Sequence, residues 1–348
     1  MTIRVGVNGY GAIGKRVADA VRLQADMELV GVADLAADWR PRVTRPKQIP
    51  LFHAGEDGGV PSGVLGTLTE LMSEVDVIVD CTPKGIGAKN ATMYREAGVK
   101  FVLQGAEKHD VTGHSFVAES NYASALGHDC TRVVSCNTTS IVRTLTALRA
   151  AGVSGLARGT LLRRATDPWE SHLGGIMNTI VPESTVPSHQ APDARTVDPE
   201  LRVSTMALKV PETLAHVHCW SVDVEPGTSR DDLMSAFAAS SRIASARFSD
   251  GLGAVNAVKE LTADLGRSRA DLYEVVVWEE LVTVDETGAY YAYMVDNQAI
   301  VIPENIDAIR ALSGVVRSGA ESIARTDAAL GVRPGRWPDS WTGRQSGG

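Results

Sequence analysis

The sequence predicts an α/β protein of two domains. Its 348 residues exceed one compact core, because domains typically hold about 100–150 residues. Over the first third, short apolar runs alternate with helical patterns, which is typical of a parallel sheet covered by helices. After Gly152 the strand-like runs follow one another with few helices between them. This second pattern predicts an α+β domain built on a mostly antiparallel sheet.

The expected elements of each half can be assigned from these patterns. In the first half we expect strands at Ile3–Val7, Met27–Val32, Val75–Asp80, Lys100–Leu103 and Val133–Ser135, and helices at Ile13–Leu23, Ala88–Ala97 and Thr138–Ala150. In the second half we expect strands at Leu156–Leu162, Val203–Val210, Leu214–Val224, Tyr273–Trp278 and Ala289–Met294, and helices at Arg230–Ala238 and Ala254–Leu261.

The domain boundaries follow from the change of pattern and from a late helix. That helix begins at Pro303, whose fixed φ suits a first helical turn, and we expect it to return to the first domain. The segment Thr166–Asp198 is too long for a plain connection and is interpreted as a functional loop. The expected domains are residues 1–136 with 303–330 and residues 137–302, followed by a disordered tail over 331–348.

Composition and charge exclude several classes of function. The net charge of −8 disfavours a nucleic-acid partner, and the basic run Arg40–Lys47 is interpreted as a solvated loop. No stretch has the ~20 apolar residues of a membrane helix, and the chain enters a strand at once, so no signal peptide is expected. Four irregularly spaced cysteines predict neither a disulfide framework nor a metal site. We therefore expect a cytoplasmic protein that binds no nucleic acid, membrane or metal.

A glycine-rich turn lies between the first strand and the first helix. Gly9 permits the tight turn, Gly11 lets the backbone approach a pyrophosphate, and Gly14 allows close packing of helix and strand. Ala12 and Ile13 open the helix, whose free N–H groups and positive dipole end attract an anion. Because the strand, the turn and the helix fall in register, the segment predicts a Rossmann-type dinucleotide-binding domain.

The end of the second strand carries information on the type of dinucleotide. Asp34 follows Val30-Gly31-Val32, where an acidic side chain can accept hydrogen bonds from ribose hydroxyls. This position favours NAD over NADP. Arg40, Arg42 and Arg45 follow closely and could reach a 2′-phosphate, so NADP remains possible.

One of the four cysteines stands where a strand gives way to a helix. Cys136 begins the expected helix, and a helix N-terminus favours the thiolate and offers N–H groups to an oxyanion. A nucleophilic thiol at such a turn, beyond a dinucleotide fold, stands where the nicotinamide C4 would meet a substrate. Cys81, Cys130 and Cys219 have no such context and are interpreted as packing residues.

Six motifs spread over nearly the whole chain carry a resemblance to a known family. They are Val5-Gly6-Val7-Asn8-Gly9-Tyr10-Gly11, Gln104-Gly105-Ala106-Glu107-Lys108-His109, Ser135-Cys136-Asn137-Thr138-Thr139, Arg163-Arg164-Ala165-Thr166-Asp167-Pro168, Pro187-Ser188-His189, and Pro303-Glu304-Asn305-Ile306-Asp307-Ala308-Ile309-Arg310. With them the chain resembles the archaeal-type (type II) phosphorylating glyceraldehyde-3-phosphate dehydrogenases. The resemblance implies a homotetramer and a Rossmann domain completed by the C-terminal helix. It also implies conversion of a phosphorylated aldehyde to an acyl phosphate through a thioester on Cys136.

The resemblance also implies a role for individual residues. It implies that Cys136 is the nucleophile and that His216 is the base. The implied cofactor contacts are Gly105, Arg164 and Gln298, beside the glycine turn; the implied substrate contacts are Ser135, Asn137, Thr138, Ser188, His189 and Gln190. His218 shares a strand face with His216, because side chains two residues apart point the same way. It is interpreted as a packing histidine.

Three departures from the family pattern keep alternatives open. The family has His-His-Gly after Pro-Ser, where this chain has His189-Gln190-Ala191; it has a second glycine at Ala106, and a Lys or Thr at Asp34. An anionic aldehyde is still expected from the cations Arg163 and Arg164, but a different aldehyde or semialdehyde remains an alternative. A non-catalytic NAD-binding redox sensor is the second alternative.

Overall fold

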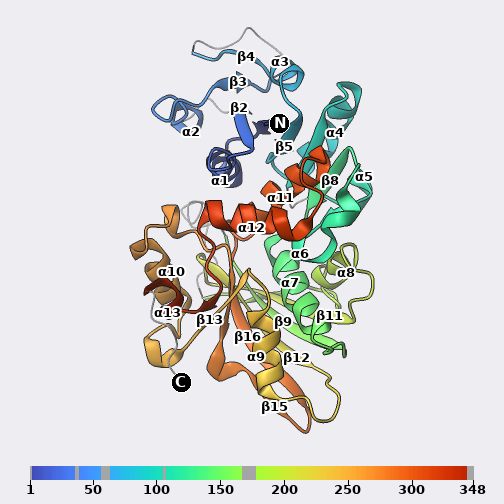
Figure 1. Cartoon of the computed structure of the whole chain (residues 1–348), viewed down its shortest axis with the longest axis vertical. Helices are drawn as coiled ribbons and strands as arrows, with labels where there is room; N and C mark the ends of the chain where they lie inside the picture. The colour runs from blue at the N-terminus through green and yellow to red at the C-terminus, as the bar shows by residue number, and fades with distance from the viewer. Residues whose placement is uncertain (1, 36–38, 56–62, 105–106, 167–177, 343–348) are drawn as a thin grey trace. The chain divides into compact units, whose positions relative to one another are not determined.

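The computed structural model describes residues 2–35, 39–55, 63–104, 107–166 and 178–342, and the chain divides into two compact units (Figure 1). Unit 1 comprises Met1–Ser135 and Val301–Leu330, and unit 2 comprises Cys136–Ile300 and Gly331–Gly348. The chain passes from unit 1 to unit 2 after Ser135 and returns after Ile300, each within two residues of the boundary expected from the sequence.

Unit 1 contains a parallel sheet, as its alternating pattern predicts. The described strands run in the order β4-β3-β2-β1-β5-β6-β8-β7, and every pairing between them is parallel. They are β1 (Ile3–Asn8), β2 (Met27–Asp34), β3 (Leu51–His53), β4 (Gly66–Thr67), β5 (Val77–Asp80), β6 (Lys100–Gln104), β7 (Ser115–Phe116) and β8 (Cys130–Val133). The helices of this unit are α1 (Ala12–Val21), α2 (Trp39–Arg42), α3 (Leu68–Ser73), α4 (Ile86–Glu96), α5 (His109–Thr112), α6 (Ala118–Asn121), α11 (Ile302–Ser313) and α12 (Gly319–Leu330).

The strand order reverses between β1 and β5, which fixes where a ligand can bind. The chain moves from β1 to β2 in one direction and from β5 to β6 in the other. Because such crossovers are right-handed, α1 and α4 cover opposite faces of the sheet. In sheets of this kind a ligand binds at the carboxyl ends of the strands at this reversal. Gly9 stands there, directly after β1.

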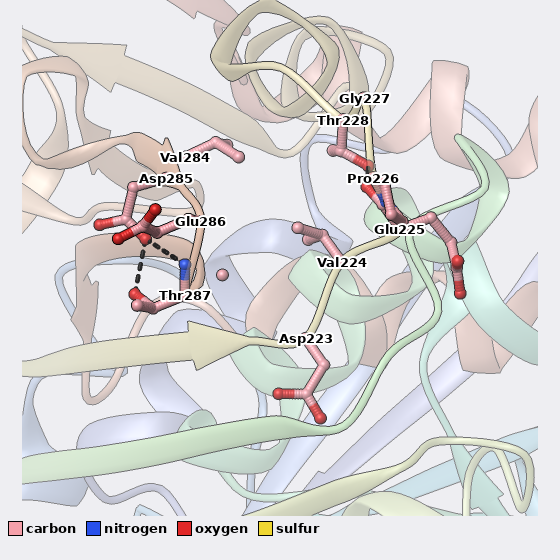
Figure 2. Close-up of a pocket in the computed structure, with 11 residues that line it drawn as sticks. Asp223, Val224, Glu225, Pro226, Gly227, Thr228, Val284, Asp285, Glu286 and Thr287 are labelled. Atoms are coloured by element: carbon pink, nitrogen blue, oxygen red, sulfur yellow. Dashed lines mark hydrogen bonds between the residues drawn. The ribbon is translucent and has the colours of Figure 1, made fainter.

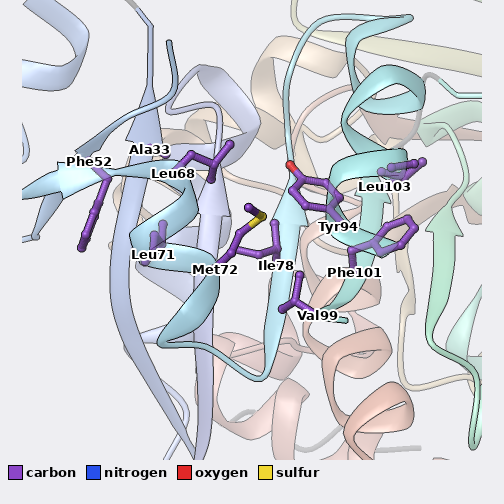
Figure 3. Packing of buried hydrophobic residues seen from close by; sticks show 11 residues of the cluster. Ala33, Phe52, Leu68, Leu71, Met72, Ile78, Tyr94, Val99, Phe101 and Leu103 are labelled. Atoms are coloured by element: carbon purple, nitrogen blue, oxygen red, sulfur yellow. The ribbon is translucent and has the colours of Figure 1, made fainter. Parts of the chain in front are cut away.

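The hydrophobic core of unit 1 packs α3 and α4 against the strands (Figure 3). Leu71 and Met72 of α3 lie beside Ile78 of β5, and Tyr94 of α4 meets Phe101 of β6 with ring centroids 5.3 Å apart. Burying side chains of this size contributes roughly 1.5–3 kcal/mol each, which holds the strand ends in register.

The late helix α11 belongs to the same unit. It contacts α1, β6 and β8, and Figure 1 draws it in red beside elements from the start of the chain. The buried guanidinium of Arg310 pairs with Asp26 at 2.7 Å, and Glu304 accepts a 2.6 Å hydrogen bond from the backbone N–H of Ala118. The sequence expectation that this helix returns to the first domain therefore agrees with the observed arrangement.

Unit 2 contains a mixed sheet that is mostly antiparallel, as expected. Its strands run in the order β10-β11-β9-β12-β16-β14-β13-β17, with β15 paired to β16. Among the described residues, five of its pairings are antiparallel and three are parallel. The strands are β9 (Ala157–Arg164), β10 (Val181–Pro182), β11 (Val203–Val210), β12 (Ala215–Val222), β13 (Ile243–Ala246), β14 (Val275–Trp278), β15 (Thr283–Asp285), β16 (Gly288–Asp296) and β17 (Gly335–Arg336). The helices are α7 (Cys136–Ala150), α8 (Gln190–Arg195), α9 (Arg230–Ala238), α10 (Val255–Asp264) and α13 (Asp339–Thr342).

The expectation of a disordered tail after Leu330 is wrong for the described residues up to Thr342. They form β17, which pairs with β13, and the short helix α13. Trp337 is fully buried in the core of unit 2, where its indole N–H donates to the carbonyl of Arg333 at 2.9 Å. The prolines and glycines of this segment suggested disorder, but burial of the Trp337 side chain fixes β17 against the sheet. Residues 343–348 lie outside the described part of the chain.

Two further expectations concern loops and membranes. The expected functional loop Thr166–Asp198 contains β10 and α8 in its described part, and residues 167–177 lie outside that part. Over the described ranges, no helix combines the length and the apolar character needed to cross a membrane.

Candidate active site

The candidate nucleophile is the first residue of α7, the helix that opens unit 2. Cys136 is partly exposed, and its Sγ lies 3.2 Å from Nε2 of His216 on β12. Because α7 begins at Cys136 itself, the thiol stands where free backbone N–H groups gather. The expected pairing of this cysteine with His216, rather than with His218, is the one that the structure brings together.

The ring of His216 is held by a backbone group on its far side. Its Nδ1 accepts a hydrogen bond from the backbone N–H of Arg164, the last residue of β9, at 3.0 Å. A backbone N–H can only donate, so Nδ1 is the unprotonated nitrogen and the proton of the neutral ring sits on Nε2. Nε2–H therefore faces Sγ of Cys136. This arrangement favours a donor role for His216 over the expected role as base.

Burial sets the protonation states of this pair. It raises the pKa of Cys136 to about 11, while the positive charges of Arg164 and Arg163 and the backbone N–H of Asn137 act in the opposite direction. The helix terminus thus has the expected effect on the thiol, but desolvation is larger. Burial also lowers the pKa of His216 well below its ordinary value, helped by the nearby His218 and Arg164. The resting pair is a neutral thiol beside a neutral imidazole.

Asn137 lies next to the nucleophile with its amide directed at the sulfur. Its Nδ2 is 3.7 Å from Sγ of Cys136, and its Oδ1 lies 2.9 Å from Nε2 of His218. The side chain is almost fully buried, so it approaches Sγ from within the protein. Ser135, the last residue of unit 1, is half-buried directly before the cysteine.

Four of the expected substrate residues lie at the start of α8 or against it: Thr138 of α7, Ser188, His189 and Gln190. Three of them are buried and have a structural role. Thr138 is fully buried and donates to Asp193 of α8 at 2.6 Å. Ser188 and Gln190 are also fully buried, and the Ser188 hydroxyl donates to Oε1 of Gln190 at 2.6 Å. These three side chains therefore hold α8 and its first turn in place and do not reach solvent.

His189 is the one of these four residues that solvent reaches. Its side chain is 62% exposed, with Nδ1 3.0 Å from Glu183 and Nε2 3.2 Å from Nε2 of Gln190. The buried side chain of Gln190 thus orients the imidazole of His189. Where the family has a second histidine, this chain has Gln190, which contacts the exposed imidazole of His189. Where the family has glycine, Ala191 lies in a regular helix that needs no positive φ.

Two cavities of unit 2 differ in charge. One of about 440 Å³ is lined by Arg163 and Lys209, which are partners across β9 and β11, together with Glu183, which pairs with Arg163. The other, of about 330 Å³, lies between two turns and carries four carboxylate side chains (Figure 2). They are Asp223, Glu225, Asp285 and Glu286. With two cations against one carboxylate, the first cavity suits an anionic group, and the second, with four carboxylates, does not.

In unit 1, the structure shows why Gly9 and Gly14 of the turn have to be glycines. Gly9 has a φ of +92°, and a Cβ there would lie 2.9 Å from the backbone of Cys81. A Cβ on Gly14 would lie 1.8 Å from the carbonyl oxygen of Gly9. Around Gly11 no described atom lies within 4 Å of such a Cβ, and no side chain caps α1, which starts at Ala12 and Ile13. The open N-terminus of α1 suits a pyrophosphate.

The remaining expected cofactor residues have different outcomes. Asp34 ends β2 and accepts a 2.6 Å hydrogen bond from the backbone N–H of Tyr10, which ties it to the glycine turn. Gln298 is almost fully buried in unit 2, and its backbone N–H donates to Asp296 at 2.7 Å. Gly105 lies outside the described residues.

Three residues that matter to the geometry were missed by the sequence reasoning. Asp193 anchors α8 to Thr138, Thr205 meets the Ser188 hydroxyl at 2.7 Å, and Tyr293 meets Nδ1 of His218 at 2.8 Å. The spacing of two residues already indicated that His218 lies on the same strand face as His216. Its partners were not indicated, because they come from other elements.

Comparisons with known proteins find relatives over nearly the whole chain. A family model described as the C-terminal domain of glyceraldehyde 3-phosphate dehydrogenase matches residues 135–306, and one described as the N-terminus of dihydrodipicolinate reductase matches residues 3–111. The chain is similar to curated proteins named glyceraldehyde-3-phosphate dehydrogenase. Those of Methanosarcina mazei, Methanopyrus kandleri and Thermococcus kodakarensis are 43%, 44% and 42% identical, over 94%, 95% and 95% of this chain and 99%, 97% and 99% of the relative.

Proposed function

The chain belongs to the glyceraldehyde-3-phosphate dehydrogenase family, and we propose that it oxidises glyceraldehyde 3-phosphate to an acyl phosphate through a thioester on Cys136. It is an oxidoreductase whose cofactor is NAD or NADP. The observation that carries the proposed mechanism is the contact of the Cys136 thiol with His216 and Asn137 at the start of α7.

The first step forms the nucleophile and attaches the aldehyde. The thiol of Cys136 loses its proton to solvent on its exposed side, and the thiolate is stabilised by Nε2–H of His216 and by the charges of Arg163 and Arg164. Sulfur attacks the aldehyde carbon, and the carbonyl π electrons move to oxygen. The resulting alkoxide is held by the two donors that face the sulfur, Nε2–H of His216 and the amide of Asn137.

The second step removes a hydride and releases the product. The dinucleotide supplies the hydride acceptor, so the aldehyde carbon is oxidised while the alkoxide closes to a thioester carbonyl. Inorganic phosphate then attacks that carbonyl, and the sulfur of Cys136 leaves as thiolate. The proton released overall is the one that the thiol lost. No step requires His216 to accept a proton, which agrees with the bond that Arg164 donates to Nδ1.

A redox sensor is not favoured as the function. Sensor cysteines need a low pKa so that the thiolate reacts with oxidants, whereas burial raises the pKa of Cys136 to about 11. The similarity to dehydrogenases also extends over 94% of the chain.

The substrate is tested by restoring the family residues beside His189. Wild type should oxidise glyceraldehyde 3-phosphate with a kcat/KM above ~10⁴ M⁻¹s⁻¹, within the usual range of enzymes. Because Gln190 is buried and, among the described residues, contacts only Ser188 and His189 through neutral hydrogen bonds, Gln190→His/Ala191→Gly should change that value by less than about tenfold. NADH absorbance with and without phosphate measures it. A wild-type value far below this, rescued by the double change, would mean that the natural aldehyde is another anionic one.

The titration of the thiol gives a second prediction. Since the pKa of Cys136 is raised to about 11, its thiolate fraction should rise tenfold for each pH unit over the neutral range. Alkylation of Cys136 by iodoacetamide, followed by mass spectrometry, should accelerate in the same proportion from about pH 7 to pH 9. No inflection near the ordinary histidine value is expected, because His216 stays neutral. A rate that levels off below pH 8 would contradict a raised pKa.

Cofactor preference gives a third prediction, which rests on Asp34. We propose NAD as the preferred cofactor, because a 2′-phosphate would meet the Asp34 carboxylate. Such a clash costs about 1–3 kcal/mol, or one to two decades in the NAD:NADP ratio of kcat/KM. Asp34→Ala should narrow the ratio accordingly. Equal use of both by wild type would show that cations nearby, such as Lys15 or Arg40 around Trp39, neutralise the clash.

We also propose that the enzyme works as a homotetramer in the cytoplasm, as its family suggests, with no nucleic-acid or membrane partner. Exposed apolar side chains gather around β10 and β11, at Ile180, Val181, Val186 and Met206. A patch of this kind supports a subunit contact. Light scattering of the full chain measures the mass, and a monomer at micromolar concentration would contradict the proposal.

A further inference from the structure

A chain of hydrogen bonds leads from the nucleophile into the sheet of unit 2. The amide of Asn137 faces Sγ of Cys136 through Nδ2, at 3.7 Å, and meets Nε2 of His218 through Oδ1, at 2.9 Å. Nδ1 of His218 lies 2.8 Å from the hydroxyl of Tyr293, its direct cross-strand neighbour on β16. His218 and Tyr293 are fully buried, and Asn137 nearly so.

The distances favour one placement of the protons along this chain. The Tyr293 hydroxyl has one proton, which it can donate to Oγ of Ser140 at 3.2 Å or to Nδ1 of His218 at 2.8 Å. Ser140 already donates to the carbonyl of Asn137 at 2.8 Å. The shorter contact favours donation from Tyr293 to Nδ1, which leaves the ring proton on Nε2. Burial lowers the pKa of His218 to about 3, so the ring stays neutral.

We propose that His218, fixed by Tyr293, is a positioning residue that keeps the N–H₂ group of Asn137 directed at the sulfur of Cys136. Nε2–H of His218 donates to Oδ1 of Asn137, and an amide whose oxygen is held in this way must present its nitrogen on the other side. The proposal rests on the proposed function, because the amide then stabilises the thiolate and the alkoxide formed from it.

The alternative orientation explains why this position needs a fixed donor. If His218 carried its proton on Nδ1, its Nε2 would accept, and the Asn137 amide would turn over to donate to it. Oδ1 would then face Sγ, and an oxygen lone pair beside a thiolate is repulsive. Both orientations fill the same space, so packing alone cannot choose between them. The hydroxyl of Tyr293 makes the choice.

The test removes the fixing hydroxyl and the donor separately in the full-length enzyme. Tyr293→Phe frees the tautomer of His218, and His218→Leu removes the donor; His218→Gln keeps an N–H at the Nε2 position. Tyr291→Phe is the matched control, because Tyr291 is a buried tyrosine of the same strand whose hydroxyl is hydrogen-bonded to neither His218 nor Asn137. Circular dichroism and the thermal midpoint confirm that each variant is folded.

Two readouts are measured for each variant. One is the rate of Cys136 alkylation by iodoacetamide at about pH 8, which needs no aldehyde. The other is kcat and KM for glyceraldehyde 3-phosphate. Tyr293→Phe and His218→Leu should slow alkylation roughly tenfold and lower kcat by tenfold or more with KM little changed, the usual loss for a hydrogen bond to a charged group. His218→Gln should recover most of both rates, and Tyr291→Phe should match wild type.

The outcomes separate this proposal from the proposed function. Folded Tyr293→Phe with wild-type alkylation and wild-type kcat overturns the positioning role, even where His218→Leu fails to fold. Equal losses in His218→Gln and His218→Leu also overturn it, because the donor would then not matter. Slower alkylation in the variants supports the role whatever aldehyde the enzyme uses. A wild type that oxidises no phosphorylated aldehyde would instead overturn the proposed function.

Discussion

Replacing Cys136 by serine is expected to lower kcat by about 10³-fold or more, while binding of the dinucleotide stays unchanged. A serine hydroxyl is a far weaker nucleophile than a thiolate, and neither His216 nor Asn137 is arranged to take its proton. No thioester would form, so the burst of NADH at the first turnover should also disappear. Stopped-flow absorbance with glyceraldehyde 3-phosphate measures both.

The matched control is the exposed cysteine of β12. Cys219→Ser removes a thiol from the same unit, at a side chain that the structure leaves in solvent, and should retain wild-type turnover. Turnover of Cys136→Ser near the wild-type value would contradict the thioester mechanism. Loss of turnover in both variants would mean that thiol chemistry elsewhere contributes.

Replacing Trp337 by alanine is expected to destabilise unit 2 by about 3–5 kcal/mol, the usual cost of emptying a buried tryptophan site. Trp337 is fully buried, its backbone N–H donates to Ser245 of β13 at 2.8 Å, and its ring meets Trp341 edge-on at 5.4 Å. In urea unfolding followed by circular dichroism, unit 2 of the variant should unfold at a lower urea concentration than in wild type.

An exposed tryptophan provides the comparison for that variant. Trp39 is 61% exposed, so Trp39→Ala should change stability by less than about 1 kcal/mol. A similar small change in Trp337→Ala would show that the segment after Leu330 contributes little to the fold. Both variants lose the same atoms, so the predicted difference follows from the burial of Trp337 and from the contacts that its ring makes.

Much of unit 1 could be predicted from the sequence because its signals are local. The glycine turn needs only the strand before it and the helix after it, and Gly9 and Gly14 stand where a Cβ would collide with backbone. The cysteine at the start of α7 is also a local signal, because helix onset and residue type are adjacent in the chain. The strand periods of unit 2 likewise indicated a mostly antiparallel sheet.

The properties of the site residues depended on partners far along the chain. The helix start predicted a lowered pKa for Cys136, but desolvation raises it, and the extent of burial is set by packing rather than by neighbours in sequence. Thr138 and Gln190 matched substrate positions of the family, yet both side chains are buried. The prolines and glycines after Leu330 predicted disorder, although the Trp337 side chain packs in the core of unit 2.

The sequence by itself therefore determined the two-domain α/β fold and singled out the glycine turn and the cysteine that we propose as cofactor site and nucleophile. Only the tertiary structure decided which nitrogen of His216 faces the sulfur, since that depends on the backbone N–H of Arg164 in another strand. It also brings His218 into contact with Asn137 and Tyr293, the contacts on which its proposed positioning role rests. The physical reason is that hydrogen-bond donors and burial act through space, and strand pairing brings together residues that no local pattern connects.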